Sequence, residues 1–311
     1  MECFVTMITP YTQNGDIDYD TAEKYVDWYF DAGLDGIFAV CQSSEMIYLS
    51  LEERVELNRV VYKRAKALEQ KHGRRFTVVS SGHISDELDA QINELNRIYE
   101  SGTDALIMVT NRFDRYMRGD SVFLENLKSV MSGLPSTAKL GLYECPLPYK
   151  RLTSDRILEF CAESGRFAYM KDTCCDAKEI GRRCDILKGS DFKLLNANCQ
   201  TLLESVRLGA DGYCGIMCNF HPKLYTLLKN SVEAGDGRAE AIQSVIGNLG
   251  FTETLAYPLT AKYHFGLCGI ETELISRNRR PDELRDYDKS CMKQMKYETD
   301  IVERFFSDSG K

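Results

Sequence analysis

The sequence lacks any run of apolar residues long enough to cross a membrane, and no basic segment precedes an apolar core at its start. A membrane-spanning helix needs about 20 apolar residues. A secretory signal needs a basic segment followed by an apolar core. Positive charge is not in excess either, because 39 Lys and Arg face 47 Asp and Glu, for a formal charge of -8. This balance disfavours attraction to nucleic acid or anionic lipid. We expect a cytoplasmic protein that binds neither nucleic acid nor membrane.

Metal-binding patterns are missing as well. The four histidines are spread through the chain, and the twelve cysteines include no Cys-x-x-Cys pair. Cys214 and Cys218 are four residues apart, but no second pair completes a zinc set. We expect reduced cysteines that serve as small apolar side chains. The sequence predicts no metal site and no cofactor.

What the sequence does contain is an alternation of short apolar runs with amphipathic stretches, typical of parallel strands joined by helical crossovers. Residues 19–32 carry apolar side chains at helical spacing, and Ser50 with Glu53 forms a capping box that begins the next helix. Eight strand-helix units favour a TIM-type (β/α)8 barrel over an open sheet. The eight strands are expected to begin near Cys3, Asp35, Phe76, Asp104, Lys139, Phe167, Phe192 and Asp211.

After the eighth unit, strand-like runs cease and charged, helical sequence continues to the end of the chain. The segment Gly235-Asp236-Gly237 is the expected hinge. We therefore predict a barrel domain at 1–233 that carries catalysis, and a C-terminal helical region at 234–311 that packs on the barrel and helps oligomer contacts.

Lys171 and Tyr143 are the candidate catalytic residues. Lys171 ends an otherwise apolar run that begins at Phe167, and Tyr143 ends a similar run that begins at Leu140. A barrel keeps its reactive groups at the carboxyl ends of its strands, and partial desolvation of an amine there disfavours the charged form. Amines of this kind form imines with ketones, and a nearby phenol can move the protons of that reaction. The pair predicts carbon-carbon chemistry on a keto acid.

A polar turn, Val40-Cys41-Gln42-Ser43-Ser44-Glu45, follows the second expected strand. Its hydroxyls and successive backbone amides are donors that suit a carboxylate. An ordinary β-α loop is the alternative interpretation of the same residues.

Several segments, taken in order along residues 3–285, together resemble one known family. They are Ile8-Thr9-Pro10-Tyr11, Ser43-Ser44-Glu45, Leu142-Tyr143-Glu144-Cys145-Pro146, Met170-Lys171-Asp172-Thr173 and Leu208-Gly209-Ala210-Asp211-Gly212. This order is similar to that of the dihydrodipicolinate synthase and N-acetylneuraminate lyase family of class I pyruvate-dependent aldolases. The resemblance implies a (β/α)8 barrel, commonly a homotetramer or homodimer, with Lys171 as the imine-forming lysine, Tyr143 as the proton-transferring phenol, and Ser43 and Ser44 at the carboxylate site.

The chain departs from the family pattern around this site. The family turn is usually Gly-Thr-Thr-Gly-Glu, so Gln42 replaces its first hydroxyl, Phe113 replaces a relay phenol, and Pro148 stands where the synthases keep an arginine. We take as candidate substrate-binding residues Gln42, Ser43, Ser44, Arg112, Phe113, Glu144, Asn196 and Cys214.

Three functions remain open at this point. The first is a lyase or aldolase that forms an imine between Lys171 and pyruvate or a 2-keto sugar acid. The second is 4-hydroxy-tetrahydrodipicolinate synthesis, which the residues at 113 and 148 disfavour. The third is a non-catalytic paralogue that binds a keto acid or sugar acid, motivated by the changes at Gln42 and Phe113. Dehydration or decarboxylation through the same imine is a further variant of the first.

Overall fold

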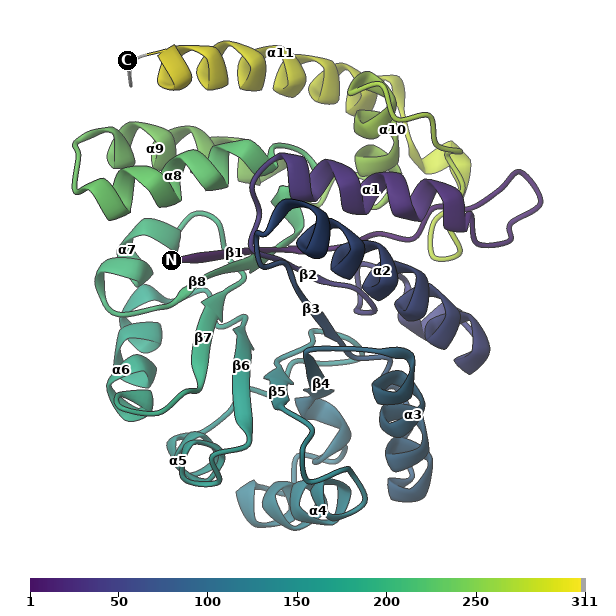
Figure 1. The fold of residues 1–311 in the computed structure, drawn as a ribbon, viewed down its shortest axis with the longest axis vertical. Coiled ribbons are helices and arrows are strands. Elements are labelled where there is room, and N and C mark those ends of the chain that lie inside the picture. Colours follow the sequence, from purple (N-terminus) through teal and green to yellow (C-terminus); the bar gives the residue numbers. More distant parts are fainter. Residues whose placement is uncertain (309–311) are drawn as a thin grey trace.

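A closed barrel of eight parallel strands forms the centre of the molecule, in a computed structural model that describes residues 1–308 (Figure 1). Each strand pairs with the next along the chain, and β8 pairs with β1, which confirms the TIM barrel predicted from the alternating pattern. All eight strands begin within one residue of the expected positions. Their bounds are β1 Glu2–Thr6, β2 Gly36–Phe38, β3 Thr77–Ser80, β4 Ala105–Val109, β5 Leu140–Tyr143, β6 Phe167–Asp172, β7 Lys193–Asn196 and β8 Gly212–Gly215.

Helices follow the strands and surround the barrel (Figure 1). The expected capping box is present at the start of α2, where the Ser50 hydroxyl accepts from the Glu53 amide and the Glu53 carboxylate accepts from the Ser50 amide. The helices are α1 Tyr19–Asp31, α2 Leu51–His72, α3 Leu88–Ser101, α4 Asp120–Ser132, α5 Asp155–Glu163, α6 Ala177–Leu187, α7 Leu202–Arg207, α8 Pro222–Ala234, α9 Arg238–Leu249, α10 Leu259–Leu267 and α11 Asp286–Asp308.

The pleat of the strands divides their side chains between two environments. In β6, Tyr169 faces the barrel interior, where its ring centre lies 5.4 Å from that of Phe4. Met170, the next residue, belongs to the outer hydrophobic layer that packs against α3 to α6. Because successive side chains of a strand point to opposite faces, Lys171 returns to the interior and Asp172 faces outward. This alternation decides which strand residues reach the mouth of the barrel.

The C-terminal helices α9, α10 and α11 pack beside α8 and α1, with α11 running along the outside of this group (Figure 1). The division into a barrel at 1–233 and a C-terminal region at 234–311 remains a proposal. It is supported by the bounds of the helices, since α8 ends at Ala234 and α9 begins at Arg238. Residues 309–311 of that region lie outside the described part. No helix within residues 1–308 is long and apolar enough to cross a membrane.

Two buried histidines lie where the C-terminal helices meet the barrel. His221 precedes α8 and stacks on the Tyr225 ring, with ring centres 5.5 Å apart, and His264 lies within α10. Neither ring nitrogen of His221 has a hydrogen-bond partner among the residues that the structure describes. Burial lowers the pKa of His221 to about 4 and that of His264 to about 3. Both rings are therefore neutral in the folded protein near pH 7.

We expect these two histidines to make the protein sensitive to acid. An unfolded histidine binds a proton near pH 6.5, whereas the folded pKa values are lower, so stability is complete above about pH 6.5 and falls as the pH drops toward 4. At pH 4, each buried ring should lower the free energy of unfolding by on the order of 3 kcal/mol. Replacing His221 by Phe should make the dependence of urea midpoints on pH between 7.5 and 5 less steep, with His264 retaining its share, whereas His72→Gln, at an exposed position, should leave it unchanged. Equal slopes for His221→Phe and wild type would contradict the expectation.

Candidate active site

Lys171 and Tyr143 meet at a cavity of about 500 Å³ at the carboxyl end of the barrel. The two residues are direct partners in the register of β5 and β6, and both side chains face inward. Lys171 Nζ lies 4.5 Å from the centre of the Tyr143 ring and 5.9 Å from that of Phe38. Lys171 is 8% exposed and Tyr143 is 3% exposed, and both line the cavity. The geometry therefore presents one amine and one phenol to a small molecule, beside the Phe38 ring.

The Tyr143 hydroxyl is held in its neutral form. Burial raises the pKa of Tyr143 well above its ordinary value, and the nearby Cys145 thiol adds to this effect. The Phe38 ring packs edge-on against the Tyr143 ring, with ring centres 5.5 Å apart. Cys145 Sγ in turn donates to Gln42 Oε1 at 3.1 Å, which connects the phenol to the polar turn after β2. In this state the Tyr143 hydroxyl carries a proton that it can donate.

The polar turn divides its two serines between different tasks. Ser43 and Gln42 line the cavity, and Ser43 Oγ donates to Thr6 Oγ1 at 3.0 Å. The Ser44 hydroxyl instead faces the interior of the turn, where it lies 2.7 Å from the Met7 carbonyl and 2.5 Å from the Ala39 carbonyl. It has no exposure to solvent, so its hydroxyl serves the loop and is not presented to a substrate. The structure therefore brings Ser43 to the cavity and does not bring the Ser44 hydroxyl there.

The backbone amides of the same turn support a carboxylate site at Gln42 and Ser43. The amides of Ser44 and Glu45 are used within the turn, since they donate to the Cys41 and Gln42 carbonyls. Those of Gln42 and Ser43 have no protein acceptor within residues 1–308. Two adjacent amides without a protein acceptor, beside a hydroxyl, are donors of the kind that suits an anion.

Glu144 lies outside the cavity, contrary to the expectation that it contacts substrate. It follows Tyr143, so the pleat turns its side chain outward, where it is fully buried between β5 and α6. Glu144 Oε1 accepts from Arg183 Nη1 at 2.9 Å and from the amide and hydroxyl of Thr153, both at 2.8 Å. Arg183 Nη1 also contacts Asp172 of β6. Glu144 therefore joins the ends of the two strands that carry the amine and the phenol.

Arg112, Phe113 and Asn196 also lie away from the cavity. Arg112 Nη1 donates to the Ile84 carbonyl and forms an ion pair with Asp86. Phe113 is buried in the outer hydrophobic layer, because its ring packs against those of His83 and Phe123. Asn196 is fully buried and its amide bonds tie the loop after β7 together, through the residues Asn198, Thr201 and Ser205. Each of these side chains is engaged by its own loop or layer, so the structure does not bring them to the site.

Cys214 in β8 occupies an intermediate position. It lies close enough to Lys171 to sense its charge, but it is 2% exposed and does not line the cavity. Burial raises its pKa to about 12, so it stays a neutral thiol. Every cysteine of the chain is a free thiol. No cluster of three His, Cys, Asp or Glu side chains in the described part is arranged to hold a metal ion.

The C-terminal region supplies a wall of the cavity that the sequence did not indicate. Glu253 and Tyr257 precede α10, and Asn278 and Arg279 lie between α10 and α11. Glu45 holds the later segment in place, because its Oε1 accepts from Ser276 Oγ at 2.7 Å and from the amides of residues 277 and 278 at 2.7 and 3.0 Å. These residues lack a sequence signal, since no strand end or repeated spacing marks them.

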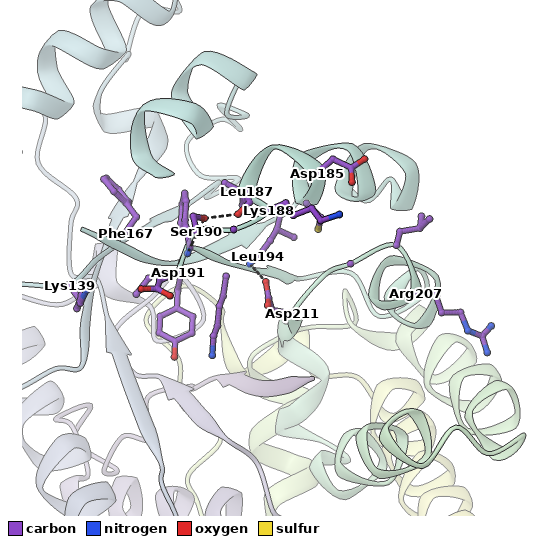
Figure 2. Close-up of a pocket in the computed structure, with 18 of the residues that line it drawn as sticks. Lys139, Phe167, Asp185, Leu187, Lys188, Ser190, Asp191, Leu194, Arg207 and Asp211 are labelled. Carbon is purple, nitrogen blue, oxygen red and sulfur yellow. Dashed lines mark hydrogen bonds between the residues drawn. The ribbon is translucent and has the colours of Figure 1, made fainter. Parts of the chain in front are cut away.

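A larger cavity, of about 800 Å³, lies at the opposite end of the barrel (Figure 2). It is lined by the starts of strands, such as Lys139, Phe167 and Asp211 (Figure 2). Two of its cations are already paired, Lys193 with Glu2 and Arg207 with Glu240. Reactive groups in barrels of this class gather at the carboxyl ends of the strands. The smaller cavity at Lys171 is therefore the candidate active site.

The fold and site define a (β/α)8 barrel with an interior lysine and tyrosine at the mouth. The model of the dihydrodipicolinate synthetase family matches residues 1–281, and the chain belongs to this family. A 4-hydroxy-tetrahydrodipicolinate synthase of Methanosphaera stadtmanae is 22% identical over 96% of this chain and 98% of its own length. A synthase of the same name from Jannaschia sp. is 25% identical over 90% and 89%.

Solved structures of the same family share the fold. YagE, a prophage protein of E. coli K12 determined in complex with pyruvate, superimposes with a TM-score of 0.83 at 19% identity and covers 96% of this chain and 99% of its own. A pyruvate complex of dihydrodipicolinate synthase from Acinetobacter baumannii gives a TM-score of 0.82 at 21% identity, with coverage of 96% and 99%. The likeness extends through the C-terminal helices as well as the barrel.

Proposed function

We propose that this protein is a class I aldolase or lyase in which Lys171 forms an imine with pyruvate or a 2-keto sugar acid. One observation carries the proposal: the Lys171 amine and the Tyr143 phenol lie side by side, 4.5 Å from Nζ to ring centre, in a cavity at the mouth of the barrel. Membership of the family and the pyruvate complexes of YagE and the Acinetobacter synthase support the choice of keto acid.

The proposed chemistry begins with addition of the Lys171 amine to the keto carbon, after which a proton moves from the nitrogen to the oxygen and gives a carbinolamine. Tyr143 then gives its proton to the resulting hydroxyl, which leaves as water, so an iminium and a phenolate form side by side and stabilise each other. The phenolate takes the proton of the hydroxyl on carbon 4, the bond between carbons 3 and 4 breaks, and its electron pair moves into the iminium. An aldehyde and an enamine result.

Release of product uses the same two groups. The Tyr143 phenol protonates carbon 3 of the enamine, which restores the iminium, and water adds to the keto carbon while returning a proton to the phenolate. Pyruvate and the free Lys171 amine are then regenerated. Throughout, the free amides of Gln42 and Ser43 and the Ser43 hydroxyl hold the carboxylate, so that the keto carbon faces Nζ.

The far side of the cavity supports an aldehyde with several hydroxyl groups. Glu253, Asn198 and Asn278 line it, and these side chains offer both hydrogen-bond donors and acceptors. Burial raises the pKa of Glu253. This composition favours a 2-keto sugar acid as the substrate that is cleaved. The second candidate function is 4-hydroxy-tetrahydrodipicolinate synthesis. It is supported by the curated relatives, which are named as synthases of this compound.

Trapping with pyruvate and borohydride tests the imine directly. The protein should gain the mass of one reduced pyruvate adduct, and the adduct should lie on the peptide that contains Lys171. Turnover of 2-keto sugar acids to pyruvate is then measured separately. An adduct without turnover of any keto acid would favour the non-catalytic binding paralogue, and absence of the adduct at high pyruvate would refute the proposal.

We further propose a cytoplasmic homodimer or homotetramer. Apolar side chains stand exposed in the loops that follow β2, β4 and β5, among them Ile47, Tyr116 and Leu147. Exposed apolar groups gathered at one end of a barrel are typical of a protein interface. Light scattering would give the mass in solution, and a monomer at micromolar concentration would exclude the assembly.

A further inference from the structure

Tyr257, from the C-terminal region, reaches the turn that is proposed to hold the keto-acid carboxylate. It lines the same cavity as Ser43 and Lys171, although 86 and more residues separate it from both in sequence. Its hydroxyl is buried and lies near the hydroxyls of Ser43 and Thr6, which act on its pKa. Burial of this hydroxyl raises the pKa of Tyr257 well above its ordinary value, so the phenol keeps its proton.

Asn219 fixes the direction in which that proton points. Asn219 Oδ1 accepts from the Tyr29 hydroxyl at 2.6 Å, and Nδ2 faces the Thr6 and Ile216 carbonyls at 2.9 and 2.8 Å. These partners settle the orientation of the amide, because carbonyls accept only from the nitrogen side. The same Nδ2 lies 3.3 Å from the Tyr257 oxygen. An amide nitrogen has no lone pair to offer, so the Tyr257 proton points away from Asn219 and toward the hydroxyls of the barrel.

These side chains lie in a row in which each can donate a hydrogen bond to the next. Asn219 Nδ2 lies 3.3 Å from the Tyr257 oxygen, the Tyr257 hydroxyl lies near Ser43, and Ser43 Oγ donates to Thr6 Oγ1 at 3.0 Å. A hydroxyl that accepts a hydrogen bond becomes a stronger donor itself. When a carboxylate binds beside the free amides of the turn, the Ser43 hydroxyl can turn from Thr6 to the anion, while Tyr257 continues to donate to it.

We infer that Tyr257 is a positioning residue that completes the keto-acid carboxylate site by donating to Ser43. The sequence offers no other phenol for this task at the expected place, because Phe113 carries no hydroxyl and is buried in the outer layer. A side chain of the C-terminal region thereby takes part in substrate binding within the same chain. This inference rests on the proposed function.

The test uses pyruvate, borohydride and the full-length protein, with labelling of Lys171 as the readout. For Tyr257→Phe, the pyruvate concentration that gives half-maximal labelling should rise about tenfold, as expected for one lost hydrogen bond to a charged group's partner. The maximal labelling rate should change less than about twofold. Acetone, a ketone without a carboxylate, should label Tyr257→Phe and wild type with equal concentration dependence. A loss that affects acetone as much as pyruvate would overturn the inference.

Two further variants separate binding from folding. Tyr25→Phe removes another buried hydroxyl at the junction with the C-terminal region, where Tyr25 bonds Thr272 at 2.6 Å, and should leave the pyruvate dependence unchanged. Ser43→Ala should raise half-saturation like Tyr257→Phe, and the double variant should be no worse than the poorer single variant, because both remove one line of donors. Additive effects, or a fall in maximal rate alone, would contradict the inference. If wild type itself is not labelled by pyruvate, the proposed function fails instead.

Discussion

Replacing Lys171 by methionine is expected to abolish imine formation and to lower the rate of keto-acid cleavage by at least about four orders of magnitude. Methionine has a similar length and fits the apolar surroundings formed by the Tyr143 and Phe38 rings, so the fold should persist. The variant has no amine that can add to the keto carbon, and the whole reaction path through the iminium is lost. Borohydride trapping and a pyruvate-release assay measure the two effects.

Lys150 provides the matched control. It lines the same cavity, but its Nζ donates to the Thr173 carbonyl at 2.6 Å and does not lie over the Tyr143 ring. Lys150→Met should keep the borohydride label on Lys171, which shows that the label reports one particular amine. If Lys171→Met is still labelled by pyruvate in the cavity, or still releases pyruvate at a wild-type rate, the proposed mechanism is wrong.

Replacing Arg183 by methionine is expected to destabilise the fold by about 3–5 kcal/mol. Arg183 is almost fully buried and neutralises two buried carboxylates, Glu144 and Asp172. Without the guanidinium, both carboxylates lose their charge partner in a place that water does not reach. Burial raises the pKa of Glu144, so the loss of Arg183 should drive proton uptake there. Urea unfolding at pH 7 measures the change in free energy.

The same network offers its own control. Glu179 also pairs with Arg183, at 3.1 Å, but it is partly exposed on α6. Glu179→Gln should cost less than about 1 kcal/mol. Adding Glu144→Gln and Asp172→Asn to the Arg183 variant should recover part of the lost stability, because no unpaired charge remains. A mild effect of Arg183→Met, equal to that of Glu179→Gln, would show that the buried pair contributes little.

Arg183 also connects stability with the candidate site. Glu144 and Asp172 directly follow Tyr143 and Lys171 in their strands, and the guanidinium holds both carboxylates from outside the barrel. Arg183 thus fixes the ends of β5 and β6, which carry the Tyr143 phenol and the Lys171 amine. Glu144, which its position after Tyr143 suggested as a substrate contact, instead helps to hold the strand ends that carry the two candidate catalytic side chains.

Local sequence was sufficient for the parts of this protein that depend on local rules. Alternation of apolar runs and amphipathic stretches predicts eight strands, and each begins within one residue of its expected position. Lys171 and Tyr143 were placed together because parallel strands in a barrel end at the same rim. The capping box at Ser50 and Glu53 is equally local, since both partners lie within one helical turn.

A residue next to a cavity-lining residue in the sequence does not itself face the cavity wherever the strand pleat or a loop contact turns its side chain away. Glu144, one position after Tyr143, points to the opposite face of the sheet. Ser44, one position after Ser43, turns into its own loop. Arg112 and Phe113 are taken up by an ion pair and by aromatic packing. These contacts cannot be predicted from how close each residue lies in the sequence to Lys171, Tyr143 or Ser43.

The amino-acid sequence by itself determined the barrel, the strand ends and the amine and phenol that they carry, because side-chain periodicity is local and parallel strands of a barrel end at the same rim. Only the tertiary structure decided that Glu45 binds residues 276–278 and that Tyr257 lines the same cavity as Ser43, since each pair joins parts of the chain more than 200 residues apart. Such contacts depend on how the C-terminal helices pack against the barrel, and that packing is a property of the whole fold.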